Sequence, residues 1–578
     1  MILYLMPNSN DEQFVQQRLL LACVLSALAV GGYFYVVGPT VPPSSTTVAT
    51  SELQNQAPDR SSVPVKKDSK NQPAAMTRAR SDDLNLQVAK REQEIVVETE
   101  TYRVTFSNRG ATVTSWILKN YNSADGQEMD LLSHGTDKSR AFTLVRSGGE
   151  AITALDDALF KINSGSHMRA GPTSVVFVYD DGRYSASKTF RFESQGYVVE
   201  IESAVTLDDI PQEHLLTWAN GFGDTRRESA SLYSTTFYYD RSENSLIRNV
   251  AGDLGEDSST VSTGPFRYVG VDDLYFTAVF MPLESGEEIR IETGETSLPT
   301  YDEEYANFVT LAAGGAETNR FQCFIGPKIF PSLGSIRPEL QEVVDFGWAG
   351  FIAKPLYWML LWTHDNVVAN YGWSIVLLTV FINIVLFPVK WKSSGSMKRM
   401  QAVAPLMKQI NDKYKGLKFN DPKKQQQQKE MQALYKKYQV NPLGGCLPML
   451  IQMPFFFAFY GVLSVAIEIR QADWLWVADL SQPEQLSIRI LPIAMMASQF
   501  WIQSLTPTPS TDAAQARIMK FMPLMFGFLF YSFQSGLVLY WLTSNLAGIL
   551  QQVFINRMPA PADLPKIEQP RRHKKKKR

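Results

Sequence analysis

The chain of 578 residues has few of the side chains that build disulfides or metal sites. Of its three cysteines, Cys23 and Cys446 lie in or beside apolar segments and only Cys323 lies in a polar region, so no disulfide framework is predicted. The five histidines show no metal-ligand spacing. We therefore expect neither a metal site nor a bound cofactor.

Catalytic motifs are also missing. The sequence contains no GxxxxGK[ST] phosphate loop, no HExxH zinc motif and no GxSxG nucleophile elbow. The apolar segments hold no pair of carboxylates for a proton relay, and no histidine lies in them to activate Ser535. The sequence thus predicts that the protein is not an enzyme.

Long apolar runs are present instead. Residues 19–37 and 371–389 are nineteen-residue segments without charge. Because a bilayer core of ~30 Å needs about 20 helical residues, each segment is predicted to span a membrane. The first resembles a signal peptide, but its run is long and no Ala-x-Ala cleavage motif follows it. We interpret it as an uncleaved anchor.

Charge is distributed unevenly along the chain. The overall net charge of -2 includes about -18 for residues 1–389, about +10 for residues 390–440 and about +7 for residues 557–578, and the other residues contribute about -1. Since Lys and Arg concentrate in cytoplasmic loops, the 371–389 segment is predicted to end in the cytoplasm at Lys390. The basic stretches are open to three interpretations: a solvated face, contact with anionic lipids, and binding to ribosomal RNA.

The region between the two apolar segments predicts a β domain. From about Gln93 to Pro327, short segments such as 174–180 and 197–206 alternate apolar and polar residues between turn residues. Many short strands without intervening helices predict a large sandwich. The residues that precede this domain are rich in Pro, Ser, Thr, Gln and Lys, which is typical of a flexible tether.

An amphipathic helix is predicted between the β domain and the second apolar segment. Apolar residues recur at spacings of three and four from Ile336 to Ile352, and Pro355 is expected to end the helix. Such a helix either packs on the β domain or lies flat in the outer membrane interface. We favour the interface because charged residues flank a single apolar face.

The C-terminal part predicts a hairpin and four further spans. In residues 390–440, apolar residues at helical spacing are followed by a second helix, with Asp421 as N-cap and Pro422 as its first residue. The last apolar block is too long for one crossing and is divided at residues 533–536, FQSG.

The predicted fold is therefore a polytopic α-helical membrane protein with six transmembrane helices, a large all-β domain and a cytoplasmic helical hairpin. The expected parts are an anchor (1–38), a linker (39–92), the β domain (93–330), the interfacial helix (331–370), transmembrane helix 2 (371–389), the hairpin (390–440), transmembrane helices 3 to 6 (441–556) and a basic tail (557–578).

Amide side chains lie at middle to inner depth in three of the predicted spans: Asn383, Gln452 and Asn545. They either form hydrogen bonds between helices or line one hydrated cavity that faces the inner side. We favour the cavity for the whole set, because the spans hold many amides and prolines but no complementary charge pairs. The other polar side chains assigned to it are Thr379, Ser498, Gln499, Tyr540 and Thr543.

Two motifs, NPLGGCLPMLIQMPFFFAFY (441–460) and SGLVLYWLTSN (535–545), resemble the YidC/Oxa family of membrane protein insertases in its Gram-negative form. The resemblance covers the chain from the anchor to the basic tail. It implies a five-helix insertase core in the bacterial inner membrane, a periplasmic domain with the β-supersandwich fold of sugar mutarotases, and both termini in the cytoplasm.

The resemblance also implies a hydrophilic groove that is open to cytoplasm and lipid and normally holds one arginine on the second span. Asn383 occupies the position of that arginine, so attraction of acidic client residues by a groove cation is not expected here. The implied groove or substrate-contacting residues are Thr379, Asn383, Gln452, Met495, Tyr540, Trp541 and Asn545.

Partners follow from the same resemblance. They are nascent inner-membrane proteins, the Sec translocon with SecDF-type accessory proteins, membrane lipids, and the ribosome through the hairpin and basic tail; the protein is expected to work as a monomer. The expected basic contacts are Lys398, Arg399, Lys423, Lys424, Lys574, Lys575, Lys576 and Lys577.

The expected function is to insert inner-membrane proteins and help them fold, alone or with the Sec translocon. A wet groove shortens the path that a polar flank must take through hydrocarbon, and no nucleotide is needed. A secondary transporter would instead show paired repeats and an ion-coordinating carboxylate, and the sequence has neither. A second alternative is an envelope carbohydrate enzyme whose active part is the β domain.

Overall fold

The computed structural model describes residues 86–557 except for short gaps, and the chain divides into two compact units at the Gly326–Pro327 bond. The predicted anchor, nearly all of the predicted linker, and the tail beyond Arg557 with Lys574, Lys575, Lys576 and Lys577 lie outside the described residues. The gaps are residues 124–125, 133–139, 149, 164–166, 170–172, 219–220, 226–229, 252–258, 285, 287, 300–304, 415–421, 441–446 and 507–512.

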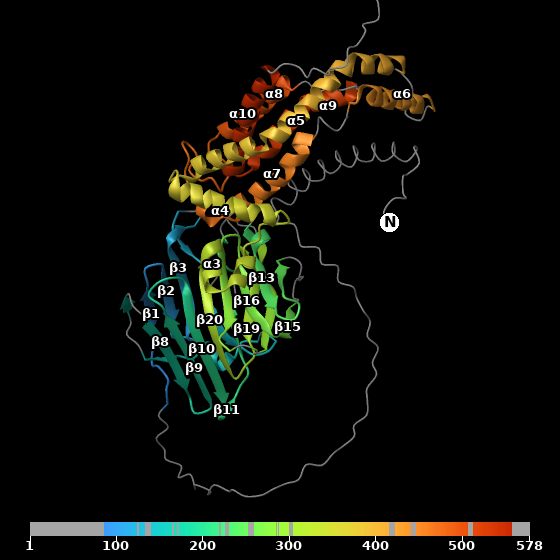
Figure 1. Ribbon diagram of the computed structural model, residues 1–578. Helices are drawn as coiled ribbons and strands as arrows, with labels where there is room; N and C mark the ends of the chain where they lie inside the picture. The colour runs from blue at the N-terminus through green and yellow to red at the C-terminus, as the bar shows by residue number, and fades with distance from the viewer. Residues whose placement is uncertain are drawn as a thin grey trace, which may run out of the picture. The chain divides into compact units, whose positions relative to one another are not determined.

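Two large sheets make up the first unit (Figure 1). The first has the order β15-β18-β19-β12-β5-β3-β2-β1-β7 with β4 beside β3, and the second has the order β14-β13-β16-β17-β20-β10-β9-β8-β6 with β11 beside β10. Neighbouring strands are antiparallel except for β1 and β7. The all-β prediction for this region is therefore confirmed.

The strands are β1 (Glu94–Glu98), β2 (Tyr102–Ser107), β3 (Thr112–Asn122), β4 (Glu128–Asp130), β5 (Ala141–Val145), β6 (Lys161–Ile162), β7 (His167–Arg169), β8 (Thr173–Asp180), β9 (Tyr184–Phe192), β10 (Val198–Leu207), β11 (Ile210–Pro211), β12 (Leu215–Trp218), β13 (Thr235–Asp240), β14 (Ser245–Val250), β15 (Thr260–Gly264), β16 (Phe266–Asp272), β17 (Phe276–Pro282), β18 (Ile289–Pro299), β19 (Tyr305–Gly314) and β20 (Thr318–Pro327). Two short helical turns, α2 (Thr153–Asp156) and η1 (Ala230–Tyr233), accompany them.

Alternating apolar residues bring the two sheets face to face. The ring of Phe106 on β2 lies 4.8 Å from that of Phe190 on β9, and Phe142 on β5 lies 5.9 Å from Phe280 on β17. All four side chains are buried. Offset and edge-on aromatic contacts of this kind stabilise a core beyond the burial of apolar area, so this unit is a sandwich with an aromatic core.

One lysine is buried in this core. Lys188 on β9 points inward, and its Nζ donates to the carbonyl oxygens of Phe142, Gly110 and Ala111 at 2.6, 2.7 and 3.1 Å. Phe142 is a bulge residue with φ of 64°, and Gly110 and Ala111 form a turn with φ of 66° and 50°, so these carbonyls leave the strand ladders. Burial lowers the pKa of Lys188 to about 7. The ammonium satisfies acceptors that the irregular backbone would otherwise leave unpaired.

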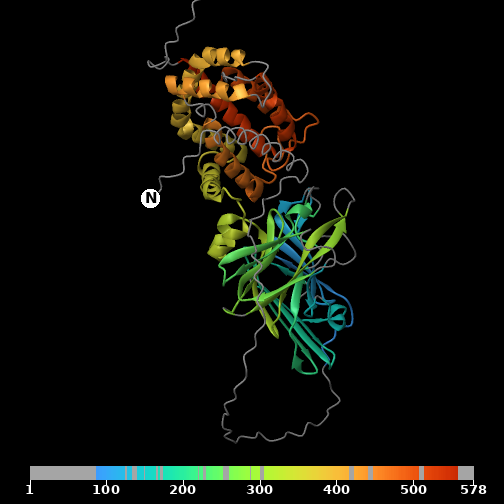
Figure 2. The same cartoon turned by 90° about the vertical axis from the view of Figure 1, so that its right-hand side faces the viewer.

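The second unit is a bundle of helices, which Figure 2 shows turned by 90°. Its elements are α3 (Phe330–Ile336), η2 (Pro338–Val343), α4 (Gly350–Asn366), α5 (Tyr371–Lys413), α6 (Pro422–Tyr438), α7 (Leu447–Val465), η4 (Ile467–Ile469), α8 (Ile490–Leu505), α9 (Ala513–Leu529), η5 (Phe530–Ser532) and α10 (Ser535–Arg557).

The predicted helix from Ile336 to Ile352 is wrong in its position. The chain forms two short helical segments there, and the long helix α4 starts only at Gly350. Asp345 accepts a hydrogen bond from the Gly347 amide, and Gly347 has φ of 71°, so a turn interrupts the pattern. Pro355 lies inside α4 and does not end it.

Exposed aromatic residues follow one face of α4. Phe351, Trp358 and Trp362 are 74%, 47% and 61% exposed, and they recur at spacings of seven and four, which is one helical stripe. The opposite face is buried through Leu356 and Leu360. The exposed stripe of α4 is thus aromatic and contains two Trp residues, the residue type that is enriched at the border between lipid and water.

The second predicted span and the first helix of the hairpin form one helix. α5 continues for 43 residues, through Pro388 and beyond residue 389, where the predicted span ends. Its last third packs against α6 through a small apolar cluster around Met400, Val403 and Met407. α6 begins at Pro422, as predicted.

The remaining helices agree with the predicted apolar segments. The break predicted at residues 533–536 is confirmed, because η5 ends at Ser532 and α10 begins at Ser535. By length and composition, α5 and α10 are the two described helices able to cross a membrane, and shorter apolar helices lie at 450–465, 490–505 and 521–532.

Candidate functional site

Helix α10 forms polar contacts with three other helices. It packs mainly against α5 and α8 and also contacts α7. The predicted site residues occur in three hydrogen-bonded groups, one for each of these neighbours. The amides therefore face other helices, as expected for polar groups among apolar helices.

The first group joins α5 to α10 around Asn383, which is 1% exposed. Its Nδ2 donates to the Thr379 carbonyl at 2.9 Å and to Ser544 Oγ at 3.3 Å. Its Oδ1 accepts from Lys390 Nζ at 2.7 Å, and its backbone carbonyl accepts from Gln551 Nε2 at 2.8 Å. Both ends of the amide are thus used.

The second group joins α7 to α10. Gln452 Nε2 donates to the Tyr540 hydroxyl at 2.8 Å. The Tyr540 ring stacks on Phe459 with centroids 4.3 Å apart. Gln452 is half-buried and Tyr540 is buried, so this contact fixes the tyrosine while part of the amide stays accessible.

The third group joins α8 to α10. Asn545 Nδ2 donates to Ser498 Oγ at 2.9 Å and to the Met495 carbonyl at 3.5 Å. One turn earlier, Trp541 Nε1 donates to Gln499 Oε1 at 3.4 Å. Trp541 is half-buried and packs on Phe456 and Phe530 at 4.9 and 5.0 Å.

The predicted site residues differ in whether they form contacts between helices. Thr379 is buried, and among the described residues its hydroxyl bonds within its own helix, to the Ile375 carbonyl at 2.6 Å. Met495 is fully buried. Sequence reasoning missed Lys390, Ser544 and Gln551; the signal for the last two was their seven-residue spacing, which places them on one face of α10.

Burial changes along α10. Every residue from Ser535 to Tyr540 is buried, whereas Trp541 and Leu542 are half-buried and both exposed and buried residues follow. On α7, residues 451–457 are half-buried and Ala458 begins the mostly buried part. The bundle is therefore closed at the end where α10 begins and packs more loosely toward the end that carries the hairpin.

The loop between α7 and α8 seals the closed end. The Ser535 and Gly536 amides at the start of α10 donate to the carbonyls of Gln482 and Leu480 at 2.7 and 2.8 Å. Glu484 accepts from the Leu491 amide and from Trp476 Nε1, both at 2.7 Å. N–H groups at the starts of α8 and α10, which have no acceptor within their own helices, thus donate to groups of this loop.

The four predicted basic contacts that the structure describes differ in exposure. Lys398 is half-buried and its Nζ donates to the Ile555 carbonyl near the end of α10, at 2.9 Å. Lys423 is exposed, and Arg399 and Lys424 are half-buried. Lys398 therefore holds α5 to α10 instead of projecting into solvent.

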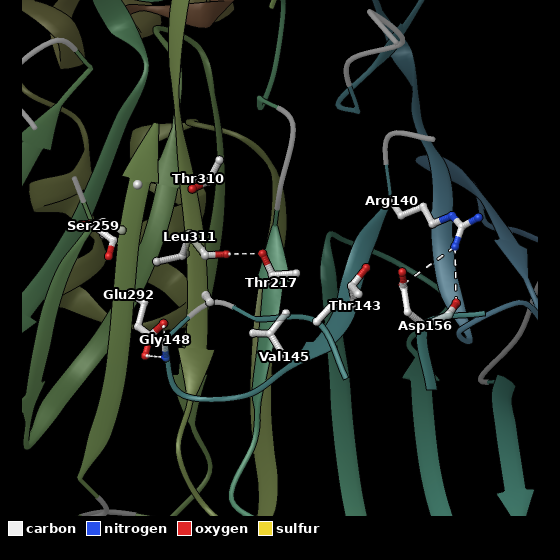
Figure 3. A pocket seen from close by; sticks show the side chains of 14 residues that line it. Arg140, Thr143, Val145, Gly148, Asp156, Thr217, Ser259, Glu292, Thr310 and Leu311 are labelled. Atoms are coloured by element: carbon white, nitrogen blue, oxygen red, sulfur yellow. Dashed lines mark hydrogen bonds and ion pairs between the residues drawn. The ribbon is translucent and has the colours of Figure 1, made fainter. Parts of the chain in front are cut away.

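A separate pocket lies on the β unit, with a volume of about 370 Å³, and Figure 3 shows its lining from β5, β12, β18 and β19. Glu292 accepts from the Gly148 amide at 2.8 Å and from Arg290 Nε at 2.9 Å, and Arg140 pairs with Asp156 at 3.9 Å. Neighbouring groups thus hold both carboxylates in place. No group of three possible metal ligands occurs among the described residues.

This combination of apolar helices, buried amide contacts and a large β sandwich defines a class: a helical membrane protein that carries a β domain. The model of the 60Kd inner membrane protein family matches residues 362–562, and that of the YidC periplasmic domain matches residues 94–359. The chain belongs to the YidC family.

Curated relatives of this chain support the same family. The "Membrane protein insertase YidC" of Pelobacter propionicus is 30% identical over 94% of this chain and 99% of the relative, and that of Ralstonia nicotianae is 34% identical over 81% and 83%. The protein of the same name from Wolinella succinogenes is 45% identical over 293 residues, which are 50% of this chain and about half, 51%, of that relative.

Proposed function

We propose that this protein is a membrane protein insertase of the bacterial inner membrane and that its helical unit performs the insertion. Relatives that span the chain bear the insertase name, and the secondary-transporter alternative finds no support in them. The β domain is proposed to lie in the periplasm and the hairpin in the cytoplasm, because the Lys and Arg residues concentrate in the hairpin.

The observation that carries the mechanism is the change of burial along α7 and α10. The half-buried residues Gln452 and Trp541 mark where tight packing gives way on the hairpin side. A depression there, lined by amides and aromatic rings, lets a polar flank enter partway without losing all its hydrogen bonds, at several kcal/mol saved per unpaired group. The apolar part of the client then moves sideways into lipid at roughly 0.3 to 0.6 kcal/mol per residue.

Client proteins are proposed to be nascent inner-membrane proteins. The hairpin, through Arg399, Lys423 and Lys424, is proposed to contact the ribosome, where basic groups bind phosphate without regard to sequence. Cooperation with the Sec translocon and SecDF-type proteins remains part of the proposal, as does contact with anionic lipids. No nucleotide or cofactor enters the mechanism.

Photocrosslinking of a stalled nascent membrane protein tests the site. A crosslinking residue at 452 or 541 should label the client, and one at the buried position 383 should label it more weakly. Leu550 is the matched control, because it lies nine residues after Trp541, half a revolution away on α10, and is 73% exposed. Equal labelling from 541 and 550 would show that clients do not use this face.

Removal of the β domain distinguishes the insertase function from that of a carbohydrate enzyme. A chain without residues 93–320 should still insert clients in cells depleted of their own insertase. An enzyme whose active part is the β sandwich would lose all activity on the same deletion.

A further inference from the structure

A tight turn in the loop between α7 and α8 exposes two large apolar side chains. Trp474 and Val477 exchange both main-chain hydrogen bonds, each 2.8 Å from nitrogen to oxygen, so Leu475 and Trp476 form the tip of a two-residue turn. Leu475 is 63% exposed and Trp476 is 44% exposed, whereas Trp474 and Val477 are buried. The tip therefore presents its apolar groups outward while its base packs on the bundle.

Leu475 has a backbone conformation that leucine rarely adopts. Its φ is 51°, which lies in the left-handed region. Turns of two residues place glycine, asparagine or aspartate at such positions, because a bulky side chain is strained there. Strain of this kind persists only where the surrounding structure holds it, and it is concentrated at functional sites. Local folding alone would favour glycine, so the exposed leucine indicates a use for an apolar group at the tip.

The turn is fixed to the start of α5. The ring of Trp474 fills the space beside Gly372, where an added Cβ would lie 2.2 Å from Trp474 Cδ1. Trp373 packs edge-on against Trp474 with ring centroids 5.6 Å apart. Asn370, the N-cap of α5, donates from Nδ2 to the Asp473 carbonyl at 3.0 Å. The tip is therefore held at a fixed place relative to the first turn of α5.

The tip continues an apolar stripe of α5. Four exposed residues recur along this helix at spacings of four, four and three: Trp373, Leu377, Phe381 and Ile384. By length and composition α5 is able to cross a membrane. The rings of Trp373, Trp474 and Trp476 follow one another at 5.6 and 5.7 Å. The stripe therefore extends to the tip at the level where the helix begins.

The charge of the loop favours an apolar occupant. Residues 468–489 hold four acidic and two basic side chains, so the loop does not attract anionic headgroups. A surface that is apolar and aromatic and lies at the end of a span fits the border between headgroups and acyl chains, where tryptophan is enriched.

We propose that Leu475 and Trp476 form a lipid anchor, which lies at this border in the leaflet on the closed side of the bundle. Leu475 reaches toward the acyl chains, and the indole of Trp476 lies at the level of the headgroups. The same loop accepts hydrogen bonds from the starts of α8 and α10, so the anchor holds three helix starts at one depth. The anchor goes beyond the insertase function and does not depend on it.

Depth-dependent fluorescence quenching tests the anchor in the full chain, reconstituted in phosphatidylcholine vesicles. A fluorescent label is attached to a single cysteine, and some of the lipids carry a nitroxide either near the headgroup or deep in the acyl chain. A label at Leu475→Cys should lie about 5 to 10 Å into the border between headgroups and acyl chains, so the shallow nitroxide should quench it more than the deep one. A label at Trp476→Cys should show the same order. The background is Cys23→Ser, Cys323→Ala and Cys446→Ser.

Two further positions calibrate the measurement. Ile384 lies thirteen residues after Tyr371, about 20 Å further along α5, so a label at Ile384→Cys should be quenched more by the deep nitroxide. Asp209 is the matched control, because it is an exposed turn residue of the β unit with φ of 64°. Neither nitroxide should quench a label at Asp209→Cys.

Four results would overturn the proposal. Quenching of the 475 label by iodide and by neither nitroxide would place the tip in water. Protection from all three quenchers would show that a protein surface covers it, from a second copy or another partner. Stronger quenching by the deep nitroxide would make the tip part of a span. A depth that changes when phosphatidylglycerol replaces phosphatidylcholine would assign the contact to charge. Each result is independent of whether the chain inserts clients.

Discussion

The buried lysine of the β sandwich leads to a prediction about stability: the difference between wild type and a variant without this lysine should change sign with pH. Lys188 donates to three carbonyls that no strand ladder uses, and burial lowers its pKa from 10.5 to about 7. The folded protein therefore releases this proton near pH 7, while the unfolded chain keeps it to about pH 10.5. Between these values the unfolded state binds more protons, so the free energy of unfolding must rise with pH.

The size of the effect follows from the same pKa. At neutral pH the half-charged lysine costs the folded state about 4 kcal/mol relative to the unfolded chain, and at about pH 9.5 it costs about 1 kcal/mol. Lys188→Met avoids this cost but loses hydrogen bonds of about 1 kcal/mol each, up to three from the ammonium and two from the neutral amine that the folded protein holds well above neutral pH. The variant should therefore be about 1 to 2 kcal/mol more stable than wild type at neutral pH and about 1 kcal/mol less stable than wild type at about pH 9.5.

Hydrogen–deuterium exchange of the β9 peptide measures this difference in the full chain in detergent. A urea series at each pH gives the free energy of opening of the sandwich alone, whatever the helical unit does. Lys161→Met removes a lysine whose Nζ bonds to an exposed loop carbonyl and is the matched control. Parallel pH dependence of wild type and Lys188→Met would refute the reasoning, because it would show that Lys188 titrates alike in both states.

Two further predictions concern the helical unit. Asn383→Leu should impair insertion in a depletion strain more than Asn383→Arg: both variants lose the acceptor of Lys390, but leucine removes every hydrogen-bonding group of the side chain whereas arginine keeps N–H donors there; equal growth of wild type and the leucine variant would remove Asn383 from the site. A double-mutant cycle of Gln452→Leu and Tyr540→Phe should give a coupling of about 0.6 to 1.7 kcal/mol in detergent unfolding, and additive effects would show that the 2.8 Å contact between them contributes nothing.

Much of the fold follows from patterns that depend on neighbours in the sequence. Alternation locates β8 and β10, and the FQSG break separates α9 from α10, because the causes of both are local. The helix predicted from Ile336 to Ile352 was wrong because the spacing of apolar residues does not reveal the turn at Gly347. The sequence also did not show that the second span and the first helix of the hairpin form one helix, α5, because a proline removes only one main-chain hydrogen bond and a helix can continue through it.

The site shows a different limit. Composition and depth identify Asn383, Gln452 and Asn545, because amides are costly among apolar helices wherever they point. They do not identify α10 as the common partner, because that depends on how each helix is rotated about its axis.

Lys390 is the clearest case of this limit. In the sequence it is one of several lysines that mark the inner end of a span, and this predicts a side chain in water. Its stem of four methylene groups is long enough to turn back, and the unused oxygen of Asn383 gives its ammonium an acceptor at 2.7 Å. The position where the resemblance implies an arginine therefore holds a neutral side chain to which an ammonium from the same helix is hydrogen-bonded.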